Sequence, residues 1–253
     1  MREGIAAVLL CVLAVSAGCS ALPGGSGGSA APEAVPGVED GHLANETALL
    51  DAHVENVTET GYAQEIRSNL TDIYQGETIE LSQRQRTRVA AGATEYRTQL
   101  VSNGGVATRV ITWGNESIAV RRGETGGGEP QYQTIEPQDP ETLAGRSLLE
   151  NRLSSEFEVA SVEEREDAPD VVTLEVTEIP ENNTVFSQQE EVENVREFEA
   201  RIAVDTRGRI HSYAAAAIYD IGGETAEYEY TFRTTTFEDP GVERPEWARE
   251  SDG

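Results

Sequence analysis

FEARIAVDTRGRIHSYAAAAIY, residues 198–219, is the stretch that decides the fold. In its first half, apolar Phe198, Ala200 and Ile202 alternate with charged or small residues, which is the period of a strand with one buried face. The tetrapeptide DTRG at 205–208 then predicts a hairpin turn into a second strand. The stretch therefore predicts an antiparallel pair with one apolar face and one solvated face.

Strand-like segments extend outward from this hairpin in both directions. Residues 172–176 before it and 228–232 after it carry large apolar side chains at every second position. Nearer the N-terminus, turns that contain glycine or asparagine separate further predicted strands, at 62–74, 77–89, 94–101, 106–113 and 117–122. Strands joined by such short turns are antiparallel.

Two helices are predicted between the groups of strands. The first covers 43–59, where apolar residues recur on one side, and it ends at Gly61. The second covers 140–153 and follows Asp139, a residue type that caps helix N-termini. The predicted order is therefore helix, meander, helix, meander.

The fold class that follows is α+β, with a curved antiparallel sheet and helices on one face. A sheet of about eight to ten long strands curls because strands twist, so we expect a half-barrel with an apolar concave side. Residues 42–238 are expected to form this single domain. A flexible Gly/Ser/Pro tether at 19–41 precedes it, and an extended acidic tail at 239–253 follows it.

The net charge of the chain excludes one class of partner and indicates the kind of organism it comes from. The chain has 46 acidic and 19 basic residues, a formal net charge of -27, and every basic residue is Arg because Lys is absent. Such a charge repels nucleic acid, so no nucleic-acid partner is expected. Acidic residues interleaved with apolar ones, together with the missing Lys, predict a folded domain with a salt-adapted surface, typical of a halophilic archaeon.

The N-terminus predicts export and lipidation. Arg2 precedes an apolar run at 5–15, which is too short to span a bilayer and is typical of a signal peptide at 1–18. The run leads to Ser16-Ala-Gly-Cys19, which resembles a lipobox, so Cys19 is predicted to carry lipid. Cys11 lies within the signal peptide, so the mature chain would hold one Cys and no disulfide. The predicted location is the extracellular face of the cell membrane, with the membrane as partner through the lipid.

Five Asn-X-Ser/Thr triplets are consistent with that location. They predict N-glycosylation, because the acceptor pattern needs a hydroxyl residue two places after the Asn. The predicted acceptors are Asn45, Asn56, Asn69, Asn115 and Asn182.

The lipobox, the tether, the helix that carries Ala52-His53 and ends in Gly61-Tyr62, and the tail segment Pro245-Glu-Trp247 together resemble a family of uncharacterised haloarchaeal lipoproteins. More remotely, the order of elements is similar to that of periplasmic lipoprotein carriers and mycobacterial lipid-binding lipoproteins. This second resemblance implies a half-barrel sheet that helices close around an apolar cavity. It concerns the fold, and fold alone does not determine function.

The sequence predicts no catalytic site. Its three His residues, His42, His53 and His211, have no metal-ligand spacing, and no nucleophile elbow, phosphate loop or dinucleotide pattern is present. Paired carboxylates are so common in this composition that they carry little information. The chain is therefore predicted not to be an enzyme and to hold no cofactor or metal, and His53 is interpreted as a core residue bonded to the backbone.

Two functions from different classes stay open. A carrier or sensor would hold an apolar small molecule or lipid in the concave sheet. The alternative is a non-catalytic envelope module for structure or interaction, with a fully packed sheet and no ligand. The sequence indicates no particular protein partner. For the carrier, the predicted ligand-binding residues are Leu174, Phe198, Ala200, Ile202, Tyr228 and Tyr230.

Overall fold

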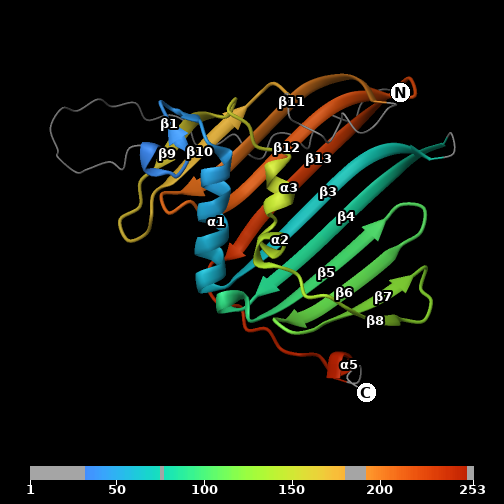
Figure 1. Ribbon diagram of the computed structural model, residues 1–253. Coiled ribbons are helices and arrows are strands. Elements are labelled where there is room, and N and C mark those ends of the chain that lie inside the picture. The colour runs from blue at the N-terminus through green and yellow to red at the C-terminus, as the bar shows by residue number, and fades with distance from the viewer. Residues whose placement is uncertain (1–31, 75–76, 180–191, 250–253) are drawn as a thin grey trace.

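The computed structural model describes residues 32–74, 77–179 and 192–249. Its central feature is one antiparallel sheet, in which thirteen described strands pair in the order β1-β2-β9-β10-β11-β12-β13-β3-β4-β5-β6-β7-β8. The sheet is curved and open, and helices cover part of one face (Figure 1). The predicted curved antiparallel sheet with helices is confirmed, and short strands bring the number above the predicted eight to ten.

Two meanders build the sheet, as the sequence predicted. The first consists of β3 (Tyr62–Tyr74), β4 (Glu77–Val89), β5 (Glu95–Asn103), β6 (Thr108–Asn115), β7 (Ala119–Thr125) and β8 (Gln131–Ile135). The second consists of β9 (Glu158–Glu163), β10 (Val171–Val176), β11 (Val192–Asp205), β12 (Ile210–Ile221) and β13 (Glu224–Thr236). Strands β13 and β3 pair, with Phe232 opposite Ile66, and this pairing joins the two meanders into one sheet.

The first helix, α1, covers Glu46–Thr60 and begins later than predicted. Asn45 is its N-cap, because the side-chain oxygen accepts a hydrogen bond from the backbone N–H of Ala48 at 3.0 Å. Leu43 lies instead in the short strand β2 (His42–Leu43), opposite Val38 of β1 (Val38–Glu39). Leu43 was therefore wrongly placed in the helix, since a buried apolar residue suits either element.

The second predicted helix, 140–153, is broken into α2 (Pro140–Ala144) and α3 (Arg146–Glu150). Gly145 separates them with φ +80°, a left-handed conformation that ends a helix and favours glycine. A side chain at this position would also lie 3.2 Å from the ring of Phe232. The single helix was thus a wrong prediction, because the glycine acts as a cap rather than as a tolerated interior residue.

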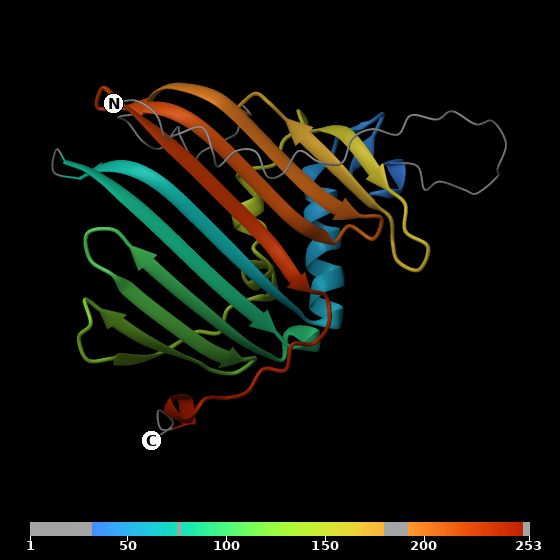
Figure 2. The same ribbon diagram turned by 180° about the vertical axis from the view of Figure 1, so that it is seen from behind.

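Helices α1, α2 and α3 lie on one face, which we call the helix side (Figure 1). Gln64 of β3 is buried there and donates a hydrogen bond to the carbonyl of Leu143 in α2 at 2.8 Å. The opposite face, called the outer face, carries the alternate residues of each strand, such as Glu65 and Arg67. Seen from behind, the strands lie in front of α1 (Figure 2).

Both ends of the described chain pack against this domain. Val35 and Val38, which fall in the predicted tether, are buried in the main core. At the other end, the short helix α5 (Glu246–Arg249) buries Ala248 against Trp113 and Val120 on the outer face. The ordered domain therefore extends beyond the predicted 42–238 on both sides. Among the described residues, no helix is long and apolar enough to cross a membrane.

Candidate functional site

The six predicted ligand-binding residues lie together on the helix side of β10–β13. Leu174 pairs with Ile202, and Ala200 pairs with Ala215, which in turn pairs with Tyr230. All six belong to one apolar cluster, and none is more than 6 % exposed. The structure thus brings together the whole set: Leu174, Phe198, Ala200, Ile202, Tyr228 and Tyr230. Their role in binding a ligand stays a prediction.

Leucines of the helices cover this cluster. Leu49 and Leu50 of α1, Leu149 of α3 and Leu153 just after α3 are fully or almost fully buried in the same cluster. The space between the sheet and the helices is therefore closed by protein side chains. A ligand could enter only if part of the helical cover moved.

Polar groups lie in this apolar interior and at its margin, where Arg152 is partly exposed. Arg152, two residues after α3, places its guanidinium carbon 3.9 Å from the ring centroid of Tyr230. The rings of Tyr230 and Tyr213 are 5.9 Å apart in an edge-to-face arrangement, and Tyr228 belongs to the same buried cluster. We call Arg152, Tyr213, Tyr228 and Tyr230 the tyrosine–arginine cluster.

Three atoms of this cluster are buried and have no hydrogen-bond partner among the described residues. They are the hydroxyl oxygens of Tyr213 and Tyr230 and the Nε of Arg152. The Nη1 of Arg152 donates to the carbonyl of Leu148 at 2.6 Å, which leaves the Nε donor unused. Leaving a polar group buried and unpaired costs about 1–3 kcal/mol, so these three atoms destabilise the ligand-free chain.

Burial keeps these tyrosines protonated. It raises the pKa of Tyr230 to about 12, and the nearby positive charge of Arg152 opposes this only in part. Burial also raises the pKa of Tyr213 and of Tyr228, again against the opposing effect of Arg152. Below these pKa values each hydroxyl remains a hydrogen-bond donor, and the guanidinium adds a permanent positive charge. The cluster therefore suits an anionic oxygen such as a carboxylate.

Sequence reasoning named Tyr228 and Tyr230 but missed Arg152. Its position at the end of the predicted helix 140–153 gave no signal, because basic residues are common at helix C-termini. Tyr213 is on the same alternating row as Ala215 and Ala217, so the period of two could have included it in the set.

Few polar contacts hold the helical cover to the sheet. Besides the bond from Gln64 to Leu143, the backbone N–H of Ile210 donates to Nδ1 of His53 in α1 at 3.1 Å. This bond and the burial of His53 confirm the interpretation of that residue as a core His bonded to the backbone. Arg146 of α3 also forms an ion pair with Asp51 of α1.

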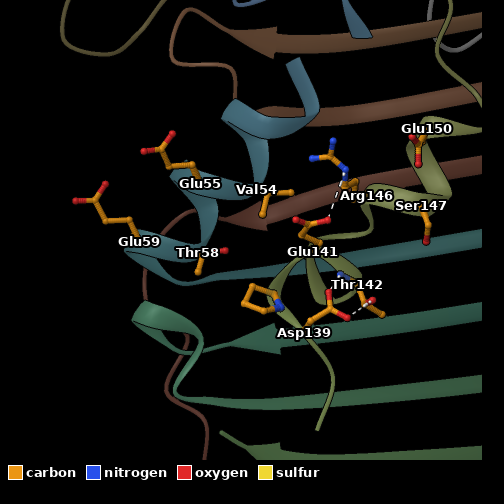
Figure 3. Close-up of a pocket in the computed structure, with 11 residues that line it drawn as sticks. Val54, Glu55, Thr58, Glu59, Asp139, Glu141, Thr142, Arg146, Ser147 and Glu150 are labelled. Carbon is orange, nitrogen blue, oxygen red and sulfur yellow. Dashed lines mark hydrogen bonds and ion pairs between the residues drawn. The ribbon is translucent and has the colours of Figure 1, made fainter. Parts of the chain in front are cut away.

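A groove lies on the solvent side of the cover, between α1 and the α2–α3 pair (Figure 3). Its volume is about 830 Å³, and none of the six predicted ligand residues lines it. Five carboxylates line it with one cation, Arg146: Glu55, Glu59, Asp139, Glu141 and Glu150.

The groove offers no recognisable chemistry. Asp139 is occupied as the N-cap of α2, because it accepts the backbone N–H of Thr142 at 2.7 Å. Glu55 and Glu59 point away from Arg146 in the close-up (Figure 3). No group of three or more potential metal ligands was found in the described part of the chain. The groove is therefore described as a solvated acidic surface.

Four of the five predicted glycosylation acceptors are described. The side-chain oxygens of Asn45 and Asn115 accept hydrogen bonds from backbone N–H groups. A glycan attached to Nδ2 would leave these bonds in place. The Nδ2 of Asn56 instead donates to the carbonyls of Ala52 and Arg207, at 2.8 and 2.9 Å, so a glycan there would disturb both bonds.

Among the remaining predicted sites, Asn69 is the one that the structure describes. Asn69 is exposed, and its Nδ2 donates to Glu229 at 3.2 Å, a contact at the surface. Cys19 and Asn182 lie outside the described residues. Lipidation and glycosylation therefore stay predictions.

Comparison with known proteins does not identify a family. No protein-family model matches the chain, and no curated protein sequence matches it. One similar solved structure is that of a DUF1329 family protein from Desulfovibrio piger, with 12% sequence identity and a TM-score of 0.27. The match covers 78% of this chain and 94% of that chain. At this level of similarity the functional argument depends on the site alone.

Proposed function

We propose that the chain is an exported lipoprotein of a halophilic archaeon, anchored to the outer face of the cell membrane, that holds an amphiphilic ligand between the sheet and its helical cover. The signal-like segment 1–18 and Cys19 support the anchor. The composition, with no Lys and a charge of -27, supports the halophilic source. The proposed function is non-catalytic.

The observation that carries the ligand is the tyrosine–arginine cluster. An anionic head group would accept hydrogen bonds from the Nε of Arg152 and from the hydroxyls of Tyr213 and Tyr230. The apolar tail would lie along Leu174 and Ile202 on the same face. Burying each CH₂ of the tail contributes about 0.8 kcal/mol, so a long acyl or isoprenoid chain can offset the cost of immobilising it.

Entry would require the α2–α3 pair to move away from the sheet. Each of these helices has five residues, and they meet at Gly145, whose left-handed backbone separates them. Short helices depend on tertiary packing for their stability, so a ligand that replaces that packing can displace them. Among the described contacts, the hydrogen bond from Gln64 is the only side-chain bond between α2 and the sheet.

Replacing Tyr213 or Tyr230 by Phe should separate stability from binding. Each change removes a buried hydroxyl that has no partner among the described residues, so the free energy of unfolding of the ligand-free chain should stay constant or rise by about 1 kcal/mol. Uptake of a fluorescent long-chain fatty acid should weaken at the same time. Chemical denaturation and a fluorescence titration in molar salt measure the two quantities.

Tyr219→Phe is the matched control. The hydroxyl of Tyr219 bonds to the backbone of Thr71, accepting from its N–H at 3.0 Å and donating to its carbonyl. Its removal should lower the free energy of unfolding by about 1 kcal/mol and leave uptake unchanged. If the unaltered chain shows no saturable uptake, the carrier function is wrong.

The alternative function, an envelope interaction module without a ligand, is favoured by one observation. The six predicted ligand residues are almost fully buried among themselves and the helix leucines, as expected for an ordinary core. In that case the tyrosine hydroxyls would bond to internal water, and no fatty acid would bind. The same titration therefore distinguishes the two functions.

The anchor has its own test. Cys19→Ser should remove the lipid mass and either release the chain from the membrane or leave an unprocessed precursor, because the lipid is carried by the thiol. Cys11→Ser is the control, since Cys11 lies within the predicted signal peptide and should not affect lipidation. Mass spectrometry and membrane fractionation measure both variants. A Cys19→Ser chain that stays processed and membrane-bound would contradict the anchor.

A further inference from the structure

Arginines gather on the outer face of the sheet, over β13 and β3–β7. The strand register aligns them in neighbouring rows: Arg67 is opposite Arg84, and Arg88 is opposite Arg97. The same rows continue across β6, β7 and β13, where Arg109, Arg122 and Arg233 lie on the outer face. We call these residues the outer arginine patch: Arg67, Arg84, Arg86, Arg88, Arg97, Arg109, Arg122 and Arg233.

This patch opposes the charge of the rest of the chain. Its rows contain eight arginines but only two glutamates, Glu65 and Glu124. The formal net charge of the whole molecule, in contrast, is -27. Further acids, such as Glu80 and Glu95, lie toward the ends of the same strands. The outer face therefore has a local positive surplus over these strands.

One carboxylate organises the centre of the patch. Glu65 accepts from Arg67 and Arg84 at 2.6 Å and from Arg86 at 2.9 Å. Burial alone would raise the pKa of Glu65, but the bonds from Arg86, Arg84 and Arg67 lower it to about 2. Three cations share this single anion, so two positive charges stay uncompensated at this point.

These arginines are accessible. The side chains of Arg67, Arg84 and Arg86 are 58, 42 and 55 % exposed. They border a surface hollow of about 440 Å³, whose other lining residues include the polar groups of Asn69 and Gln99. No described helix covers Arg67, Arg84 and Arg86; α5 packs at Trp113, opposite Arg97 at the margin of the patch (Figure 2). The patch is thus open to a negatively charged partner.

We propose that the outer arginine patch docks onto the phosphate head groups of an anionic lipid membrane. The patch crosses six neighbouring strands, which at about 4.8 Å per strand span about 24 Å. An array of this width fits many phosphate groups side by side rather than one small anion. Because the Debye length is about 8 Å at 0.15 M salt and about 3 Å at 1 M salt, a membrane responds to the face turned toward it and not to the net charge of the whole chain.

The length of the tether supports this choice of occupant, which rests on the proposed anchor at Cys19. Twelve residues separate Cys19 from Pro32, where the described chain begins, and they can reach at most about 40 Å. The domain would therefore remain close to the bilayer that holds it. Docking through the patch would then set its orientation.

The test uses the chain from residue 20 onward, which contains every described residue and lacks the lipid. Vesicles of equal parts phosphatidylglycerol and phosphatidylcholine are compared with vesicles of phosphatidylcholine alone. The experiment is run at the lowest sodium chloride concentration at which circular dichroism shows the folded chain. We expect flotation with the anionic vesicles only, and binding that weakens as salt is added. Binding by the unlipidated chain is independent of the anchor, so the two proposals can fail separately.

Two patch variants and one control locate the contact. Arg67→Gln/Arg84→Gln/Arg86→Gln should reduce vesicle binding at least about tenfold. A second triple variant, Arg88→Gln/Arg97→Gln/Arg109→Gln, should do the same while it leaves the three bonds to Glu65 intact. The control triple removes the same charge from ion pairs elsewhere on the sheet and in the loop after β9, and should bind as the parent does: Arg165→Gln, Arg196→Gln and Arg201→Gln.

Three outcomes would overturn the proposal. The first is no binding of the parent chain to anionic vesicles. The second is an equal loss in the patch variants and the control, which would indicate net charge rather than the patch. The third is binding to a DNA duplex, or self-association with a second copy through its acidic groove, in preference to vesicles at the same salt concentration.

Discussion

Asp205→Ala should lower the free energy of unfolding by about 3–5 kcal/mol, because it leaves a buried cation and several buried donors without their acceptor. Asp205 is only 1 % exposed and begins the turn between β11 and β12. Its carboxylate accepts the backbone N–H groups of Arg207 and Arg209, at 3.0 and 3.1 Å, and the side chain of Arg209 at 2.8 Å. His211 also lies 3.2 Å from the same carboxylate.

Two further variants separate the parts of this effect. Asp205→Asn keeps an oxygen for the backbone donors but loses the charge that offsets Arg209, so it should cost less than Asp205→Ala. Asp220→Ala removes a carboxylate from the exposed ion pair with Arg196 and should cost at most about 1 kcal/mol. Urea unfolding followed by circular dichroism measures all three. Equal losses in the Asp205→Ala and Asp220→Ala variants would contradict this account of the turn.

The pKa of Asp205 is shifted in the direction expected for a carboxylate that stabilises the folded chain. Burial alone would raise it, but the hydrogen bonds from His211 and Arg209 outweigh burial and lower it. A carboxyl whose pKa is lowered by folding stabilises the folded chain above its unfolded pKa, and the contribution is lost as the pH falls through the folded value. The loss caused by Asp205→Ala should therefore be largest near neutral pH.

Acidification should also destabilise the chain through His53, by about 3 kcal/mol between pH 6.5 and pH 4. Burial lowers the pKa of His53 from 6.5 to about 4, and the carbonyl of Ala144 and the charge of Asp205 oppose this shift only in part. The unfolded chain therefore binds a proton in this window that the folded chain does not. The stability is complete above pH 6.5 and declines as the pH falls toward 4.

His53→Asn isolates this contribution, since many carboxylates also titrate in acid. The Asn side chain can accept the bond from Ile210 in place of Nδ1 and carries no charge, so the difference in unfolding free energy between the two chains should vary with pH from 6.5 to 4. A parallel pair of profiles for the unaltered chain and His53→Asn would contradict the burial of a neutral imidazole.

Local sequence patterns predicted much of the secondary structure. The alternation around Ile202 and the DTRG turn gave the β11–β12 hairpin, which Asp205 and Gly208 close with a backbone bond of 2.8 Å. The weak strands were missed. β8 and β9 are mostly exposed and carry no clear alternation of burial, because each lies toward an edge of the sheet or under little cover.

Sequence alone determined what depends on composition and on neighbours along the chain. The acidic charge without Lys, the signal-like N-terminus, the period of two in the strands and the glycine turns are all local properties. They were sufficient for the fold class and for the row that contains Leu174, Phe198 and Tyr230. These residues share a face because side chains alternate along every strand.

Tertiary structure alone decided which faces meet and which charges gather. The pairing of β13 with β3, strands from opposite ends of the domain, makes one sheet from two meanders. The place of Arg152 over Tyr230 depends on how the helices fold back onto that sheet. The outer arginine patch depends on register, since a slip of one residue would turn Arg84 to the helix side. Pairing and register are long-range choices, made by burial of the whole apolar face, and no local window of sequence contains them.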